Sequence, residues 1–262
     1  MREQLIPKFF PKFWAKTALH RLTPGGFGYH RKLRTCADAS YEHERDKHPV
    51  RHKHHGGGGW KAEEVAGIQQ RDYADYDEYL THQKLKLDEM LKIKGGFSNE
   101  DLMNFRVQFY LRFRHLPALL PHDARILCMG ARQGTEVEVL RDLGFPNAQG
   151  IDLNPGPDNP WVKPGDFMHL DYPDSSLDLL YTNCVDHAFD LDAFFDEHRR
   201  AMKPAGFVLY DIGVNMEEGG GPFEAVSWKR SEDIFQKLLG KFKTLVRVER
   251  EKNWMWVLLQ GK

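Results

Sequence analysis

The sequence is poor in cysteine and has no long apolar run. Its 262 residues include three cysteines, Cys36, Cys128 and Cys184, which are too few and too scattered for a disulfide framework. Such usage is typical of proteins in reducing compartments. No segment approaches the roughly 18 consecutive apolar residues that mark a membrane span, and residues 1–20 lack the apolar core of a secretory signal. We therefore expect a cytoplasmic protein without a transmembrane segment.

The net charge of the whole chain is only −1, but the charged residues of each sign are unevenly distributed along it. Residues 1–60 hold 12 Lys and Arg against 5 Asp and Glu, so the rest of the chain is acidic. We expect residues 1–61 to form a basic, His- and Gly-rich arm that is partly disordered. Its start, LIPKFFPKFWAK, can pack against the body of the protein, and contact with an anionic membrane or nucleic acid is the alternative.

The arm also contains a histidine-rich run that invites a metal site. Its five histidines are followed by four consecutive glycines and are His43, His48, His52, His54 and His55. A zinc site needs ligands that a fixed scaffold holds in tetrahedral geometry. Because this run has no such scaffold and ends in a flexible glycine tract, we predict no metal site, with adventitious binding of a metal or a polyanion as the alternative.

Residues 62–120 have the spacing of helices. Residues 72–91 place apolar and tyrosine side chains near one helical face, and Ser98, with Glu100 and Asp101 behind it, predicts the start of a second helix that runs through Phe113. We expect the two helices to form a cap beside a sheet. Some cap residues are candidates for cofactor or substrate contact, with packing or solvent exposure as the alternative for each: Tyr76, Tyr79, His82, Arg106 and Arg112.

Residues 125–152 contain half of a nucleotide-binding unit. The apolar run 126–129 suits a buried parallel strand, and Gly130 and Gly134 bracket a turn at which a ligand can approach bare backbone. A helix from Thr135 would point its amides at that ligand. Asp152 ends the next apolar segment, where a carboxylate can accept hydrogen bonds from ribose hydroxyls.

The elements that follow continue this α/β order. Strands are predicted before Gly165, over 177–182 and over 207–212, with a helix over 191–203 between the last two. Ser231 is predicted to cap a helix over 232–239. The segments 242–250 and 254–260 suit an antiparallel pair of strands that closes the sheet.

The succession GARQGTE, GID, GDF, DSSLDLLYTN and MKPAGFVLYDIG resembles the class I S-adenosylmethionine-dependent methyltransferases, in particular the branch called type 11. The resemblance runs from Arg125 to the C-terminus. It implies a Rossmann-like, seven-stranded, mostly parallel sheet whose last strand is antiparallel, in a domain over 121–262. It also implies S-adenosylmethionine as the cofactor and, as the acceptor, a small molecule that is methylated at oxygen, nitrogen or carbon.

The resemblance also implies roles for individual residues. The turn residues Gly130, Arg132 and Gly134 would lie under the methionine part of the cofactor. Asp152, followed by Leu153, would hold the ribose. Asp166 and Phe167 would contact adenine, and Asn183 would border the transferring methyl.

One departure from the family concerns the methionine part of the cofactor. Cys128 stands where the family commonly has an acid that binds the cofactor's amino group. Glu136 can take over that group and Arg132 can meet the carboxylate. The alternative is that Arg132 and Glu136 are solvated or form an ion pair with each other at the start of the helix.

The segment TNCVDHAFD follows the fourth strand, where the family borders the transferring methyl. His187 has a pKa suited to removing a proton near neutral pH, and Asp186 can orient it; a structural role for His187 is the alternative. The segment lacks the double-proline motif of enzymes that methylate base amines or glutamine amides. Asp211, followed by Ile212 and Gly213, likewise departs from the magnesium-dependent catechol type.

Two further interpretations of the sequence remain. A nicotinamide-dependent dehydrogenase shares the first strand, turn and helix, but it would have a third glycine where this chain has Thr135. A noncatalytic protein that keeps the fold for binding is favoured by Cys128.

Overall fold

The computed structural model describes residues 59–94, 98–156, 158–213, 223–228, 230–251 and 254–261. The basic arm, with its histidine run and its predicted contacts, lies outside the described residues except for its last three positions. Within the described ranges, no helix is long and apolar enough to cross a membrane.

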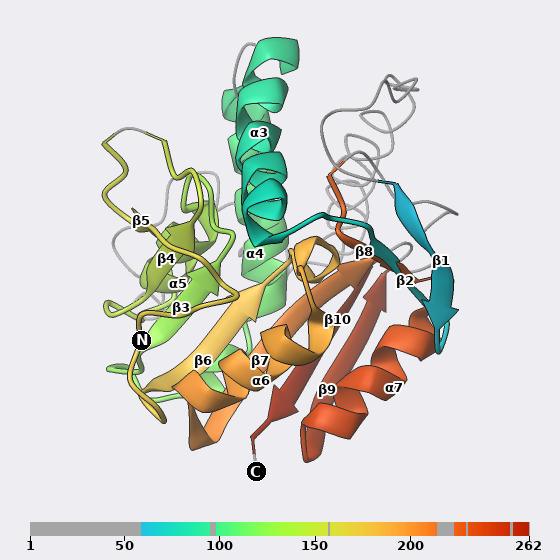
Figure 1. The fold of residues 1–262 in the computed structure, drawn as a ribbon. Coiled ribbons are helices and arrows are strands. Elements are labelled where there is room, and N and C mark those ends of the chain that lie inside the picture. The colour runs from blue at the N-terminus through green and yellow to red at the C-terminus, as the bar shows by residue number, and fades with distance from the viewer. Residues whose placement is uncertain are drawn as a thin grey trace, which may run out of the picture.

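A seven-stranded sheet forms the centre of the molecule, in the order β5-β4-β3-β6-β7-β10-β9 (Figure 1). Neighbouring strands from β5 to β7 are parallel, whereas β10 is antiparallel to both β7 and β9. The predicted Rossmann-like sheet with an antiparallel last strand is confirmed. Its strands, in sheet order, are β5 Val162–Pro164, β4 Gln149–Asp152, β3 Ile126–Met129, β6 Leu177–Thr182, β7 Met202–Gly213, β10 Trp254–Gln260 and β9 Thr244–Glu251.

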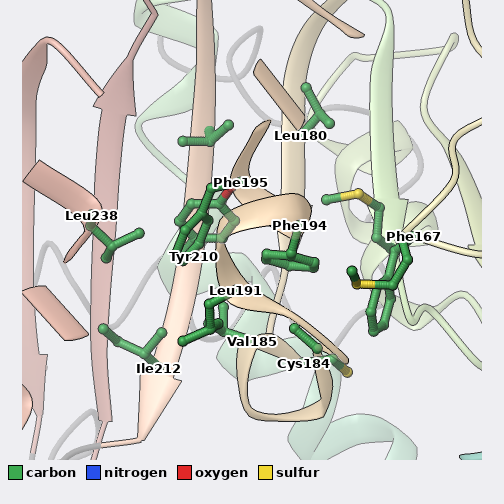
Figure 2. Packing of buried hydrophobic residues seen from close by; sticks show 14 of the residues in the cluster. Phe167, Leu180, Cys184, Val185, Leu191, Phe194, Phe195, Tyr210, Ile212 and Leu238 are labelled. Atoms are coloured by element: carbon green, nitrogen blue, oxygen red, sulfur yellow. The ribbon is translucent and has the colours of Figure 1, made fainter. Parts of the chain in front are cut away.

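Helices cover both faces of the sheet, because strands buried on both sides carry apolar side chains in both directions. On one face, α6 (Leu191–Ala201) and α7 (Ser231–Lys241) enclose a core in which Phe194 and Phe195 pack against Tyr210 (Figure 2). On the other face, α5 (Thr135–Asp142) and α4 (Asn99–Phe113) cover a second core.

The helix α4 begins where the sequence predicted. Ser98 accepts a hydrogen bond from the Asp101 amide, and the Asp101 carboxylate accepts one from the Ser98 amide, which completes a capping box. Its end lies beside the sheet: Phe113 packs edge-to-face on Tyr181 of β6 with ring centroids 4.7 Å apart. The buried aromatic residues Phe109 and Phe113 in its last turns make this contact.

The helix α3 (Tyr76–Lys94) stands over the carboxyl ends of the parallel strands (Figure 1). Its first turns are anchored in the core: Tyr79 is fully buried and donates a hydrogen bond to the His187 carbonyl at 3.1 Å. The helix therefore places side chains directly beside the loops that follow β4, β5 and β6.

A second sheet, which the sequence analysis did not predict, joins β1 (Trp60–Val65), β2 (Ile68–Arg71) and β8 (Val226–Trp228). Ala66 and Gly67 both have positive φ, at 52° and 77°, as a tight two-residue hairpin turn requires. The usual signal for such a turn is Asn-Gly or Asp-Gly, and Ala-Gly does not carry it.

The start of α7 corrects one expectation. Ser231 is the first helical residue rather than the cap, and Arg230 occupies the cap position without a side-chain hydrogen bond to the helix. The hydroxyl of Ser231 faces Glu232 Oε2 at 3.5 Å instead. Glu232 and Asp233 do lie in the first turn, as predicted.

Candidate functional site

The turn after β3 has the backbone that its glycines predicted. Gly130 and Gly134 have φ of 71° and 82°, and Arg132 between them has φ of 44°. A Cβ on Gly130 would lie 2.8 Å from Cys184 Sγ, and one on Gly134 would lie 2.9 Å from Val162 Cγ2. Both positions therefore need glycine for space as well as for conformation.

Asp152 joins the end of β4 to this turn. Its carboxylate accepts hydrogen bonds from the Arg132 amide at 3.0 Å and from the Asn154 amide at 2.8 Å. Two carboxylate oxygens offer about four acceptor positions in all. Asp152 thus holds the turn in place and can still accept hydrogen bonds from two hydroxyls.

Asp166 is bound in a similar way after β5. It accepts hydrogen bonds from the Met168 amide at 2.8 Å and from the Tyr76 hydroxyl of α3 at 2.6 Å. Burial raises the pKa of Tyr76, and its hydrogen bond to Asp166 adds to the shift. The contact fastens α3 to the loop after β5.

Two cavities lie on either side of the glycine turn. The smaller cavity, of about 50 Å³, is lined on one side by Asp152, Leu153 and Phe167. The larger cavity, of about 320 Å³, is lined by Thr135 and Glu136 of α5, by the loop after β6 and by residues of α4. The residues common to both are Lys86, Gly130, Arg132, Cys184 and His187.

Glu136 supplies a buried carboxylate to the larger cavity. It is 4% exposed and forms no ion pair with any described residue. Burial raises its pKa to about 8, and the charge of Arg132 offsets only part of the shift. Arg132 and Glu136 therefore do not form the close ion pair that was one alternative interpretation of the sequence.

His187 is held by three partners, and Asp186 is not one of them. Its Nδ1 lies 2.9 Å from the Phe223 carbonyl oxygen and 3.0 Å from Gln83 Oε1. Since both are acceptors, Nδ1 carries the ring proton and Nε2 has the lone pair. Nε2 lies 2.5 Å from Lys86 Nζ, which donates to it. The distance from Asp186 Oδ2 to Nε2 is 3.8 Å, so the carboxylate does not orient the ring through a hydrogen bond.

Burial and neighbouring carboxylates raise the pKa of Asp186, which lies beside His187. Asp186 has a pKa of about 7, chiefly because of burial and next because of the charge of Glu224. Glu224 Oε2 is buried without a hydrogen-bond partner among the described residues. Asp211 of β7, by contrast, is paired with Arg112 of α4, whose guanidinium lies 4.9 Å from the Trp256 ring.

The other predicted residues divide between the cavities and the body of the protein. Asn183 lines the larger cavity and accepts a hydrogen bond from Cys184 Sγ at 3.2 Å. Arg106 instead binds Glu138 and Asp142 of α5. Other expected positions are buried and line neither cavity: Tyr79, His82 and Cys128.

Several residues that line the cavities or hold His187 were not predicted from the sequence. Lys86 and Gln83 come from α3, Phe223 and Glu224 from the segment before β8, and Trp254 from β10. None belongs to a motif, and α3, the segment before β8 and β10 bring them together from distant parts of the sequence. Among the described residues no group of three metal-ligating side chains occurs.

Comparison with known proteins agrees with this architecture. Residues 127–210 match the family model described as a methyltransferase domain. The chain is similar to the Burkholderia thailandensis 1,6-didemethyltoxoflavin-N1-methyltransferase, solved with 1,6-didemethyltoxoflavin and S-adenosylhomocysteine: the TM-score is 0.55 at 14% identity, over 78% of this chain and 100% of that one.

A second solved structure, the complex between the Haloferax volcanii Trm112 methyltransferase activator and a putative methyltransferase, has a TM-score of 0.50 at 13% identity, over 62% of this chain and 94% of that one. No curated protein sequence matches the chain. At these identities the similarity to solved structures shows the fold. Residues 127–210 therefore match a methyltransferase domain, and the described chain has a Rossmann-like methyltransferase fold.

Proposed function

We propose that the protein transfers a methyl group from S-adenosylmethionine to a small-molecule acceptor. The observation that carries this proposal is the pair of cavities that meet at the glycine turn, at the carboxyl ends of the parallel strands. This edge of an open α/β sheet is where ligands bind. The cofactor supplies a methyl group on a positively charged sulfonium.

The residues of the smaller cavity fit the adenosine part. Asp152 has acceptor positions left for the ribose hydroxyls, with Leu153 beside it. Asp166 and Phe167 would contact adenine, and the Tyr76 hydroxyl closes over Asp166. Gly130 lines both cavities.

The larger cavity fits the methionine part. The buried carboxylate of Glu136 has no ion-pair partner among the described residues, and the cofactor's amino group would provide one. It would thereby replace the acid that the family places at Cys128. Arg132 would meet the cofactor's carboxylate, with Gly134 at the start of α5 and Asn183 beside the transferring methyl.

The rest of the larger cavity is left for the acceptor. Phe105 and Gln108 of α4 and Trp254 of β10 give it an aromatic and polar wall. Asp186, with a pKa of about 7, can take up a proton from an acceptor above that pH, whereas burial holds the pKa of His187 well below its usual range. Alignment and exclusion of water would supply most of the rate.

Calorimetric titration of S-adenosylmethionine, S-adenosylhomocysteine and NADH tests this function. We expect both adenosyl sulfur compounds to bind, NADH not to bind, and Asp152→Ala to lose the binding. Asp171→Ala, which removes an exposed carboxylate, is the matched control and should bind as the wild type does.

Each other outcome points to a different function. Selective binding of NADH would favour a dehydrogenase. Binding of the adenosyl compounds without turnover on any acceptor would favour the noncatalytic protein. Absence of all binding would contradict the role given to the glycine turn. A cytoplasmic location remains a prediction that fractionation of cells can check.

A further inference from the structure

Lys86 lies at the junction of the two cavities. It belongs to the small group of side chains that lines both, together with Arg132, Cys184 and His187. Under the proposed function, the smaller cavity takes the adenosine part and the larger cavity takes the methionine part. The sulfonium sulfur joins these two parts, so it would lie at this junction, next to Lys86.

The surroundings of Lys86 disfavour a permanent positive charge. Its Nζ donates to His187 Nε2 at 2.5 Å, and it forms no ion pair with a described carboxylate. Because Phe223 and Gln83 fix the proton of His187 on Nδ1, the ring offers Lys86 a neutral acceptor rather than a negative charge.

The charges that face Lys86 come from several elements. Arg132 of the glycine turn opposes the ammonium, whereas Asp186 and Glu224 favour it, and the Cys184 thiol lies beside them. Burial is the largest effect and lowers the pKa of Lys86. Of the charged groups, Arg132 keeps its charge over the whole working range of pH.

We propose that Lys86 discriminates the sulfonium cofactor from its thioether product by charge: uncharged Lys86 accommodates S-adenosylmethionine, and protonated Lys86 favours S-adenosylhomocysteine. This inference rests on the proposed function. Two positive charges at this junction, partly shielded from water, repel each other. The product has lost one positive charge, so the ammonium no longer opposes it.

The proposal fixes the sign of a pH dependence. Below the pKa of Lys86, binding of S-adenosylmethionine must release a proton, so its Kd falls by up to about tenfold for each pH unit of increase. Above that pKa the dependence ends. The Kd of S-adenosylhomocysteine lacks this dependence, so the ratio of the two constants, cofactor over product, falls as pH rises.

Carboxylates at the site also lower the ratio of the cofactor's Kd to the product's Kd as pH rises. Asp186 and Glu136 become negative as pH rises through about 7 and about 8, and each would then attract the sulfonium. A slope in the wild type is therefore insufficient. Variants of Lys86 must separate its charge from theirs.

The experiment is calorimetry of both ligands from about pH 6 to about pH 9, a range that covers the titration of a buried lysine, in two buffers of different ionisation enthalpy. In the wild type we expect proton release with S-adenosylmethionine that exceeds the release with S-adenosylhomocysteine. Lys86→Met should lower the ratio of the cofactor's Kd to the product's Kd and remove most of the dependence of this ratio on pH. Lys86→Arg, which keeps its charge, should hold the ratio high at every pH while the product still binds.

Lys84→Met is the matched control, because Lys84 is exposed on the same helix and its loss should leave the ratio unchanged. An equal loss of affinity for both ligands in Lys86→Met, with the slope intact, would overturn the proposal and make Lys86 a ligand of the cofactor's carboxylate. A slope that survives in Lys86→Met and vanishes in Asp186→Asn would also overturn it. Failure of the wild type to bind either ligand would instead refute the proposed function itself.

Discussion

The two cavities differ in how their carboxylates are satisfied. Asp152, which lines the smaller cavity, and Asp166, which precedes its lining residue Phe167, each accept two hydrogen bonds from protein groups. In the larger cavity, Glu136 is buried and Asp186 is partly buried, and neither side chain accepts a hydrogen bond from another described residue. The smaller cavity is preorganised, whereas the larger cavity holds the carboxyl groups of Glu136 and Asp186, with which a cationic ligand can pair.

This contrast has a cost in stability. A buried carboxyl without a partner keeps its proton, and the folded state must release it as pH rises. Ligand binding gives a reason to retain such carboxyl groups, because a cationic ligand provides the partner that the protein itself does not. Four substitutions test whether the contrast is real, and they follow in order of expected effect.

Arg112→Met should have the largest effect, since Arg112 and Asp211 form the one buried ion pair described in the wall of the larger cavity. Loss of the arginine leaves Asp211 buried without its cation, and we expect the free energy of unfolding to fall by about 3–5 kcal/mol. Urea unfolding measures it. Adding Asp211→Asn should restore part of the stability. No restoration would mean that Arg112 acts mainly through its packing on Trp256.

Glu136→Gln should separate stability from binding. The raised pKa of Glu136 means that its stabilising contribution is present below about pH 4.5 and is lost as pH rises through about 8. At pH above about 8 the variant should therefore be more stable than the wild type by about 1–3 kcal/mol, with little difference at acidic pH, where an exposed glutamate is protonated as well.

The same variant should bind S-adenosylmethionine and S-adenosylhomocysteine about tenfold more weakly, because both carry the amino group. Thermal unfolding at two pH values and calorimetry give the two readouts. A variant that gains stability and keeps its affinity would show that Glu136 does not bind the amino group.

Tyr76→Phe should lower stability and leave cofactor affinity nearly unchanged, which is the opposite of the effect expected for Glu136→Gln. It removes the hydrogen bond to Asp166, and we expect the ligand-free protein to lose about 1–2 kcal/mol of stability. Cofactor affinity should stay within about threefold, a change of less than 1 kcal/mol, because Asp166 keeps its bond to the Met168 amide and gains a free acceptor. A much larger loss of affinity would place the Tyr76 hydroxyl on the cofactor itself.

Arg106→Ala should have the smallest effect. Arg106 links α4 to Glu138 and Asp142, whose side chains are 41% and 39% exposed, outside both cavities. Ion pairs of this kind contribute about 0–1 kcal/mol. We expect a stability loss in that range and unchanged affinity for S-adenosylhomocysteine. A clear loss of affinity would return Arg106 to the candidates for ligand contact.

The contrast between the cavities also explains what the sequence could predict. The glycine turn and most of the wall of the smaller cavity are made by residues that closely follow parallel strands, so Asp152 and Asp166 could be placed from strand ends alone. The predicted antiparallel pair at the C-terminus follows from local patterning in the same way. Such features depend on backbone geometry that a short segment determines.

The larger cavity depends on contacts between distant segments. Lys86 reaches His187 from α3, and Phe223 reaches it from the segment before β8. The three-stranded sheet that brings this segment in rests on a hairpin without the usual turn residues. Adjacency in sequence suggested Asp186 as the partner of His187, yet the adjacent carboxylate lies 3.8 Å from the ring nitrogen and distant residues bind it.

A crystal structure of the complex with S-adenosylhomocysteine tests the cofactor site most directly. We expect the ribose hydroxyls on Asp152, adenine against Phe167, and the amino group within hydrogen-bond distance of Glu136. The thioether sulfur should lie beside Lys86. An adenosine moiety bound elsewhere, or an amino group that leaves Glu136 without a partner, would contradict the assignment of the two cavities.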